Sequence, residues 1–92
     1  MDKLTPDQRA EAVERLAGWT LDGEELHRTF EFSNFVRSMG FVTSVAILAE
    51  KANHHPDIDI RWNRVTLRLT THDAGGLTER DVDLAARIDK LT

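Results

Sequence analysis

The sequence predicts an α+β fold, namely a four-stranded antiparallel sheet with three helices packed on one face, in the order α-β-β-α-β-β-α. Three segments repeat their apolar residues at helical spacing, and four others alternate apolar with polar residues. Alternation is typical of strands that bury only one face, and such strands usually form antiparallel sheets. The helices would then cover the single apolar face of that sheet.

The first helix is predicted to begin after Thr5. Thr5 and Gln8 have the spacing of a capping box, and Pro6 suits the first position of a helix. Gly18 would end the helix, because glycine readily adopts the backbone conformation that terminates one. The expected inner face consists of Ala10, Val13 and Leu16.

The first hairpin should follow directly. A short strand over residues 19–21 and a longer one over residues 25–32 flank Asp22 and Gly23, a pair that favours tight hairpin turns. Arg28 interrupts the alternation of the longer strand. Its inward-facing residues should be Leu26, Phe30 and Phe32, and its outward-facing ones His27, Thr29 and Glu31.

A long second helix is predicted over residues 34–53, with Ser33 as its N-cap. It carries two neighbouring apolar stripes. One consists of Phe35, Met39, Val42, Ala46 and Ala49, and the other of Phe41, Val45 and Leu48. A helix that is apolar on more than one side must be covered on more than one side, and one sheet covers only one. We therefore expect this helix to pack against another subunit as well.

A second hairpin should follow the second helix. Pro56 ends the helical region, and residues 57–62 and 65–70 then alternate apolar with polar side chains. A tight turn at Asn63 would join these two strands.

The end of the chain should form the last helix. Residues 74–76 are typical of a loop, and Thr78 would cap the helix, since Asp81 occupies the capping-box position three residues later. The expected inner face consists of Val82, Ala85, Ile88 and Leu91.

Composition limits what the protein can be. At 92 residues there is room for one domain, residues 1–92. The net charge of −4 argues against direct binding of nucleic acid, which needs a basic surface. The absence of cysteine excludes disulfides, thiolate catalysis and zinc–sulfur sites. No secretory leader is visible and no apolar stretch reaches the roughly 18 residues of a membrane span, so we expect a cytoplasmic protein without membrane contact.

Three histidines at the ends of elements are the candidates for chemistry. His54 and His55 follow the second helix, and His72 ends the fourth strand. Histidine exchanges protons near neutral pH, so these side chains suit general acid–base catalysis. Glu50 lies four residues before His54, on the same face of a continuous helix, where its carboxylate would orient the imidazole.

Two other interpretations of these residues remain open. Paired histidines at the end of a helix can bind its last carbonyl groups and complement its dipole. The three histidines and Glu50 could alternatively be ligands of a metal ion, although adjacent histidines do not easily point at one centre.

The histidine region resembles a known protein family. Residues 50–56, Glu-Lys-Ala-Asn-His-His-Pro, resemble the E-x-x-x-H-H-P signature of the pterin-4a-carbinolamine dehydratases, which continues with an aromatic residue, a histidine and an aspartate. The corresponding residues here are Trp62, His72 and Asp81. Residues 70–81 resemble a second block of the family, and the resemblance extends over nearly the whole chain. Asn53 stands where many members have aspartate, and Ile58 where many have an aromatic residue.

The resemblance implies an enzyme, a hydro-lyase that dehydrates 4a-hydroxytetrahydrobiopterin to quinonoid dihydropterin in the recycling of pterins. It implies four catalytic residues, with His54 and His72 as general acid and base. The third, His55, would mainly bind the pterin or exchange roles with His54, and the fourth, Glu50, would orient the pair or meet the donor-rich edge of the pterin. The implied substrate-binding residues are Asn53, Pro56, Thr71, Asp73, Ala74 and Asp81. Asp81 has a second interpretation, as a charge that supports the N-terminus of the last helix.

The resemblance also implies partners and an alternative. No metal or cofactor is expected, because the pterin is the substrate. A homodimer or homotetramer is expected, together with a functional link to an aromatic amino acid hydroxylase, which releases the substrate. The alternative is a non-catalytic factor of the same fold that binds proteins as a dimerisation factor, assembly chaperone or coactivator.

Overall fold

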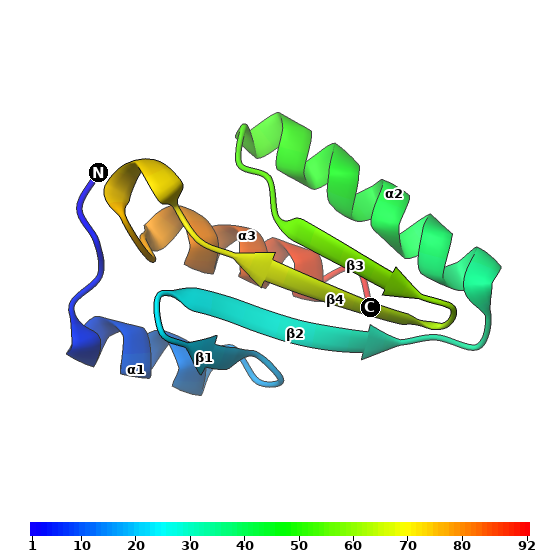
Figure 1. The fold of residues 1–92 in the computed structure, drawn as a ribbon, viewed down its shortest axis with the longest axis horizontal. Helices are drawn as coiled ribbons and strands as arrows, with labels where there is room; N and C mark the ends of the chain where they lie inside the picture. The colour runs from blue at the N-terminus through cyan, green and yellow to red at the C-terminus, as the bar shows by residue number, and fades with distance from the viewer.

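The computed structural model describes all 92 residues and confirms the predicted order of helices and strands. Three helices and four strands follow one another along the chain from α1 to α3 (Figure 1). Their bounds are α1 Pro6–Arg15, β1 Thr20–Asp22, β2 Glu25–Glu31, α2 Phe35–Ala52, β3 Asp57–Arg61, β4 Arg64–Leu69 and α3 Glu79–Asp89. A short 3₁₀ helix, His72–Ala74, lies in the loop between β4 and α3.

The two hairpins join along their longer strands to form one sheet. Its order is β1-β2-β4-β3, and every neighbouring pair is antiparallel (Figure 1). The buried side chains of β2 and β4 all lie on one face and enter the hydrophobic core: Leu26, Phe30, Val65, Leu67 and Leu69. The other face remains polar, so the helices cover one side of the sheet, as predicted.

Hydrogen bonds at the helix starts follow the local sequence signals, with one exception. Thr5 and Gln8 form a capping box at α1, and Thr78 and Asp81 form another at α3. Ser33 is not the cap of α2, contrary to the prediction. The side-chain oxygen of Asn34 accepts the hydrogen bond from the N–H of Arg37, 2.9 Å away, so the helix begins one residue later than expected.

The predicted inner faces need three corrections. In α1 the buried residue is Ala12 rather than Ala10, which is exposed. In α3 Leu84 joins the predicted Val82, Ala85 and Ile88, whereas Leu91 lies beyond the end of the helix and is exposed. In α2 the residues that face the core are Ser38, Phe41, Val45 and Ala49, so most of the other predicted stripe points away from the sheet.

Arg28 interrupts the pattern of β2 because its side chain binds the end of α3. Its guanidinium donates to the carboxylate of Asp89, 2.9 Å away, and lies 4.4 Å from the centre of the Phe30 ring. The indole N–H of Trp19 donates to the same carboxylate at 2.8 Å. Gly18, which has a φ of 91°, leaves room for this guanidinium, since a Cβ atom there would lie 2.9 Å from it. β1 begins at Thr20, one residue later than expected.

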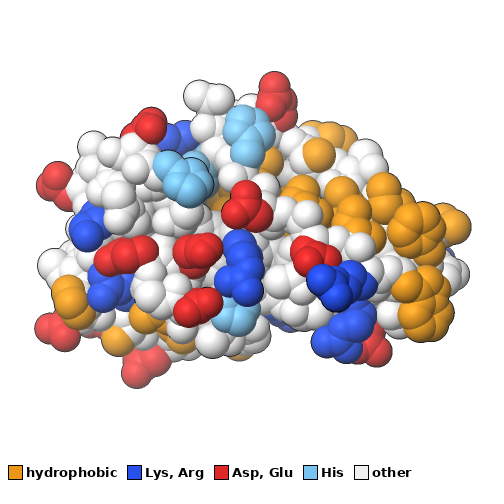
Figure 2. All heavy atoms as spheres, viewed as in Figure 1, with side chains coloured by type: hydrophobic (Ala, Val, Ile, Leu, Met, Phe, Trp, Pro, Cys, Tyr) orange, Lys and Arg blue, Asp and Glu red, His pale blue; other side chains and the backbone are white.

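A group of large apolar side chains remains exposed. On α2 these are Phe35, Val36, Met39 and Ile47, and near them on the second hairpin are Ile58 and Trp62. Figure 2 shows hydrophobic side chains gathered at one end of the molecule, over α2 and the β3–β4 hairpin. Trp62 forms the hairpin turn with Asn63 and has a positive φ of 50°, so it is not part of β3 as predicted. None of the three helices is both long and apolar enough to cross a membrane.

Candidate active site

The end of α2 directs His54 toward α3. Asn53 adopts the left-handed conformation, with φ 51° and ψ 44°, which asparagine tolerates better than most residues. The N–H of His54 then donates back to the carbonyl of Ala49 at 3.0 Å, as in a Schellman motif. This reversal ends the helix before His54, so His54 no longer shares a helix face with Glu50.

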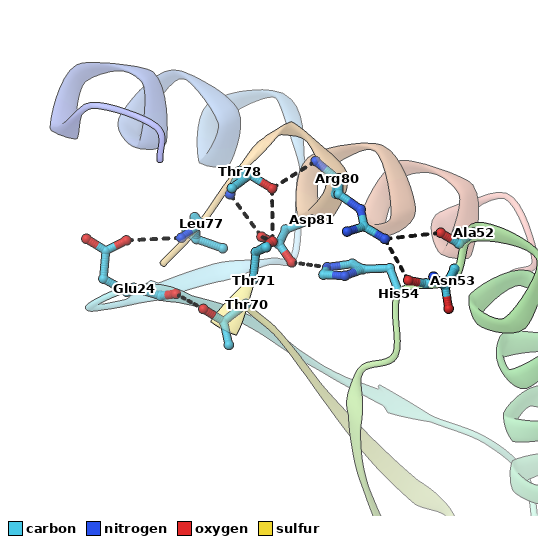
Figure 3. A network of polar contacts seen from close by, with 10 residues as sticks. All are labelled: Glu24, Ala52, Asn53, His54, Thr70, Thr71, Leu77, Thr78, Arg80 and Asp81. Carbon is cyan, nitrogen blue, oxygen red and sulfur yellow. Dashed lines mark hydrogen bonds and ion pairs between the residues drawn. The ribbon is translucent and has the colours of Figure 1, made fainter. Parts of the chain in front are cut away.

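His54 binds a buried carboxylate that comes from a different element. Its Nε2 atom lies 2.5 Å from Oδ1 of Asp81, and the Asp81 side chain has no exposed surface (Figure 3). The other carboxylate oxygen, Oδ2, accepts the hydroxyl of Thr71 at 2.7 Å and the N–H of Thr78 at 2.9 Å. One carboxylate therefore caps α3, holds the end of β4 and orients the imidazole.

This network defines which nitrogen of His54 carries a hydrogen. An ionised carboxylate only accepts hydrogen bonds, so Nε2 of His54 is the donor to Asp81. The hydroxyl of Thr71 is also committed to Asp81, so Thr78 donates its own hydroxyl to Thr71 at 2.9 Å. Nδ1 is the ring nitrogen of His54 that remains available to accept a proton.

Glu50 pairs with His55 rather than with His54. Oε1 of Glu50 lies 2.9 Å from Nε2 of His55, and both side chains are largely exposed. The prediction that Glu50 orients His54 is therefore wrong, because it required α2 to continue through Asn53. Asp81 performs that task instead.

Arg80 supports the reversal at the end of α2, and the sequence analysis did not identify it. Its Nη2 atom donates to the carbonyl of Asn53 at 2.6 Å and to that of Ala52 at 3.3 Å (Figure 3). Arg80 thus binds the last carbonyls of α2, and the ring nitrogens of His54 and His55 bind carboxylates. The interpretation that the histidine rings bind the last carbonyls of α2 is therefore wrong.

His72 approaches the same region from the loop after β4. It begins the 3₁₀ helix and is exposed. The loop is closed at its base by two backbone hydrogen bonds between Thr71 and Gly76, of 3.1 and 3.2 Å. Gly75 has a positive φ of 78° and reverses the chain within the loop.

A polar cavity of about 260 Å³ brings the two histidine regions together. Its lining residues are Asn53, His54, His55, Thr70, Thr71, His72, Asp73 and Arg80. Thr70 and Arg80 were not predicted. Four predicted site residues lie outside the lining: Glu50, Pro56, Ala74 and Asp81. No group of three or more histidine, aspartate or glutamate side chains is close enough to hold a metal ion.

The arrangement suits proton transfer to a small polar molecule. Two imidazoles, His54 and His72, face one cavity from separate segments, and one of them is oriented by a buried carboxylate. Such pairs can donate and accept protons at different atoms of one bound molecule. The remaining lining offers hydroxyl, amide, carboxylate and guanidinium groups as hydrogen-bond partners.

Comparison with known proteins gives a consistent result. Residues 2–91 match the family described as Pterin 4 alpha carbinolamine dehydratase. A protein named for this family from Acidobacterium capsulatum is 58% identical over 99% of both chains. Another, from Natronomonas pharaonis, is 48% identical over 98% of this chain and 96% of its own.

Two solved structures resemble the fold. A transcriptional coactivator/pterin dehydratase from Brucella melitensis superposes with a TM-score of 0.93 at 37% identity, over 98% of both chains. A pterin dehydratase-like protein described as a RuBisCO assembly factor in the alpha-carboxysome superposes with a TM-score of 0.65 at 26% identity, over 79% of this chain and 84% of its own.

Proposed function

The chain belongs to the pterin-4a-carbinolamine dehydratase family of hydro-lyases, and from this premise we propose that it dehydrates 4a-hydroxytetrahydrobiopterin by histidine acid–base catalysis. The product would be quinonoid dihydropterin, returned to a pterin recycling pathway. The observation that carries the proposal is the cavity that His72 shares with His54, whose imidazole is bonded to Asp81.

The reaction requires two proton transfers. Hydroxide is a poor leaving group, so a general acid must protonate the 4a-oxygen before the C–O bond breaks and water departs. A base must remove the proton from a ring nitrogen, whose electrons then form the C=N bond. Histidine side chains perform both tasks near neutral pH, and each such transfer typically contributes about 10²- to 10⁴-fold.

The network around Asp81 supports a division of these roles. Nε2 of His54 is committed as a donor to Asp81, which leaves the lone pair of Nδ1 to accept a proton. We assign His54 as the base and His72 as the general acid. Asp81 would also stabilise the imidazolium that forms when His54 accepts the proton.

The other predicted residues would bind the pterin or support the site. His55, with Glu50 behind it, and Asn53 and Asp73 offer polar groups at the cavity or its rim. Thr71 and Asp81 are buried and bonded to each other, so we assign both as positioning residues. Pro56 would stiffen the turn into β3. Ala74 ends the 3₁₀ helix that begins with His72, and neither residue lines the cavity.

No cofactor is needed for this chemistry. Dehydration changes no oxidation state, and its two proton transfers can be carried by the imidazoles alone. A hydroxylase that releases 4a-hydroxytetrahydrobiopterin would supply the substrate, so we expect such an enzyme in the same compartment, the cytoplasm.

Assembly into a homo-oligomer is part of the proposal. Val36 is 77% exposed and Ile47 62% exposed on the outer face of α2, and Met39 lies between them. Large apolar side chains exposed together on one helix face often mark an interface. A homodimer or homotetramer that buries this face would explain why α2 is apolar on two sides.

The proposal is tested by stopped-flow absorbance of 4a-hydroxytetrahydropterin decay, with and without the protein after treatment with a chelator. Faster decay that survives the chelator is the expected result. Unchanged decay, with folded protein confirmed by circular dichroism, would reject the enzyme. The favoured function would then be the alternative, a non-catalytic protein-binding factor. The RuBisCO assembly factor of similar fold and the exposed face of α2 support that alternative.

A further inference from the structure

Glu24, in the turn between β1 and β2, contacts both ends of the loop that carries His72. Its backbone carbonyl accepts the hydroxyl of Thr70 at 2.7 Å, just before the loop. Its carboxylate oxygen Oε1 accepts the N–H of Leu77 at 3.1 Å, just after the loop. Figure 3 shows Glu24 lying against these two residues, on the far side of the network from His54.

The Glu24 side chain is itself held from the N-terminal segment. Oε2 lies 2.8 Å from Nη1 of Arg9 and 3.6 Å from Nζ of Lys3. The hydrogen bond from the N–H of Leu77 and the charges of Arg9 and Lys3 lower the pKa of Glu24, so the ionised form is favoured. A second attachment lies beside it, because the N–H of Leu4 donates to the carbonyl of Leu77 at 2.7 Å.

Gly76 is the residue that lets the carboxylate approach. A Cβ atom at this position would overlap Oε1 and Cδ of Glu24. Gly76 is not among the glycines with positive φ, so its backbone conformation does not itself require glycine. The space for Glu24 is therefore a physical reason for glycine at this position.

The loop has few other attachments. Its 3₁₀ helix lacks a side-chain cap, and His72 and Asp73 are exposed. Within residues 71–76, the Thr71–Gly76 bridge and the bond between Thr71 and Asp81 are the main connections. Removal of the Glu24 side chain would take the acceptor from the N–H of Leu77, whereas the backbone carbonyl that accepts from Thr70 would remain.

We propose that Glu24 is a positioning residue for His72, fixing the loop so that the imidazole faces the cavity opposite His54. The expected effect of Glu24 on the reaction rate rests on the proposed function. Its expected effect on the order of the loop does not. Misplacement of a catalytic group by about 1 Å can cost about 10²-fold in rate. Glu24 would therefore act on the proton-transfer step, although it does not line the cavity.

A double-mutant cycle in the dehydratase assay tests the kinetic consequence. Glu24→Ala is expected to lower kcat by about tenfold with little change in KM. In a His72→Ala background the same substitution should lower kcat by less than about twofold, because its effect passes through His72. Equal losses in both backgrounds would overturn the proposal, since they would indicate a general structural effect.

Amide hydrogen exchange tests the structural consequence without any activity. Glu24→Ala should speed exchange at Thr71, Ala74 and Gly76 by about tenfold or more, while the amides of β4 keep their protection. Unchanged exchange in this loop would overturn the proposal, whatever the activity. If the wild type proves inactive but exchange in the loop is still faster in Glu24→Ala, the proposed function is rejected. The structural role of Glu24 in holding the loop is then still supported.

Three further variants sharpen the test. Glu24→Gln keeps an acceptor for Leu77 and loses the charge opposite Arg9, so an intermediate loss of about threefold is expected. Gly76→Ala should reproduce the loss seen for Glu24→Ala and add little to it, since both displace the same carboxylate. Glu31→Ala is the matched control, because it removes an exposed ion pair with Arg64 at the other end of β2.

Discussion

Nε2 of His54 lies 2.5 Å from a carboxylate oxygen of Asp81, and Asp81 has no exposed surface. The same carboxylate accepts hydrogen bonds from Thr71 and Thr78. Two segments far apart in the sequence, the end of α2 and the start of α3, are therefore joined at the residue that we assign as the base. A change at Asp81 should affect both the chemistry and the stability.

Asp81→Asn should abolish most activity while keeping the fold. The amide oxygen can accept from Thr71 and Thr78, which turns the amide nitrogen toward His54. Nε2 of His54 must then accept, so Nδ1 carries the hydrogen and can no longer take a proton. We expect kcat to fall by about 10²-fold or more with little change in KM.

The decisive measurement for this variant is to determine which tautomer His54 adopts. Nitrogen-15 NMR of the imidazole should report hydrogen at Nε2 in the wild type and at Nδ1 in Asp81→Asn. The same tautomer in both proteins would contradict the assignment. Asp81→Ala is the companion variant, since it leaves three buried donors without an acceptor, at a cost of about 1–3 kcal/mol each.

Substitution of each histidine should show whether that side chain contributes to catalysis alone or to stability as well. His72→Ala and His54→Ala should each lower kcat by about 10²-fold or more. His72 is exposed, so its loss should leave the free energy of unfolding unchanged, whereas loss of the buried His54 leaves Asp81 short of a partner and lowers it. Paired measurements of kcat and urea unfolding check this.

His55→Ala is the matched variant for that series. It is largely exposed and bonded only to Glu50, so we expect a raised KM and a smaller loss of kcat than at the other two histidines. Full activity in both His54→Ala and His72→Ala would show that the catalytic residues lie elsewhere.

Local signals predicted much of the fold because they act within a few residues. The capping boxes of Thr5 with Gln8 and of Thr78 with Asp81 each span one helical turn, and both are present. The alternation in β2 and β4 likewise identified the buried face of the sheet. The prediction for α2 was weaker, because a helix with two apolar stripes does not reveal which one meets the sheet.

The site could be predicted only in part, because its contacts cross between elements. The histidines were found from their residue types, but the partner of His54 depends on where α2 ends. One residue in the left-handed conformation, Asn53, turns His54 away from Glu50 and toward Asp81. Arg80 had no signal in the sequence, since its role depends on the carbonyls of Ala52 and Asn53 lying within reach.

Arg80→Met should weaken the turn that carries His54. The substitution keeps an unbranched apolar stem and removes the donors to the carbonyls of Ala52 and Asn53. We expect the free energy of unfolding to fall by about 1.5–3 kcal/mol, the range for hydrogen bonds to a charged group, and kcat to fall with it. Chemical denaturation and steady-state kinetics measure the two effects.

Asn53→Gly provides the control for the same turn. Glycine adopts the left-handed conformation without a steric penalty, so this variant should match the wild type closely in stability. Asn53→Val should instead cost about 1–2 kcal/mol. A stable and fully active Arg80→Met would show that the left-handed turn alone positions His54.

The stability contributed by Glu24 should depend on pH. Its pKa is lowered in the folded protein, chiefly by the hydrogen bond from the N–H of Leu77 and then by Arg9 and Lys3, which outweigh the opposing effect of desolvation. The contribution is therefore complete above the pKa of the unfolded chain, about 4.3, and is lost as the pH falls through the folded value. Glu24→Gln lacks this titration.

Urea unfolding of both proteins across this range checks the sign. The wild type should be the more stable at neutral pH, and the difference should shrink as the solution becomes more acidic than about pH 4.3. A difference that stays constant down to low pH would show that the charge of Glu24 is not the cause. Glu31→Gln, in an exposed ion pair, should show little difference at any pH.

The exposed face of α2 should determine the oligomeric state. Val36 and Ile47 are 77% and 62% exposed, and both lie on the side of the helix that faces away from the sheet. The double substitution Val36→Glu with Ile47→Glu places two charges on this face, where burial against another copy would desolvate them. Light scattering after size-exclusion chromatography should change from a multiple of 10.5 kDa to 10.5 kDa itself.

A matched substitution outside α2 distinguishes an effect of this helix face on the oligomeric state from a general effect of added charge. Ala10 is exposed on α1, which lies away from α2 (Figure 1), so Ala10→Glu should leave the mass unchanged. The double variant should keep its circular dichroism spectrum, because neither side chain belongs to the core. If the wild type is already a 10.5 kDa monomer at high concentration, α2 does not bind a second copy of this chain. Its apolar face would then be available to a different protein, as the non-catalytic alternative requires.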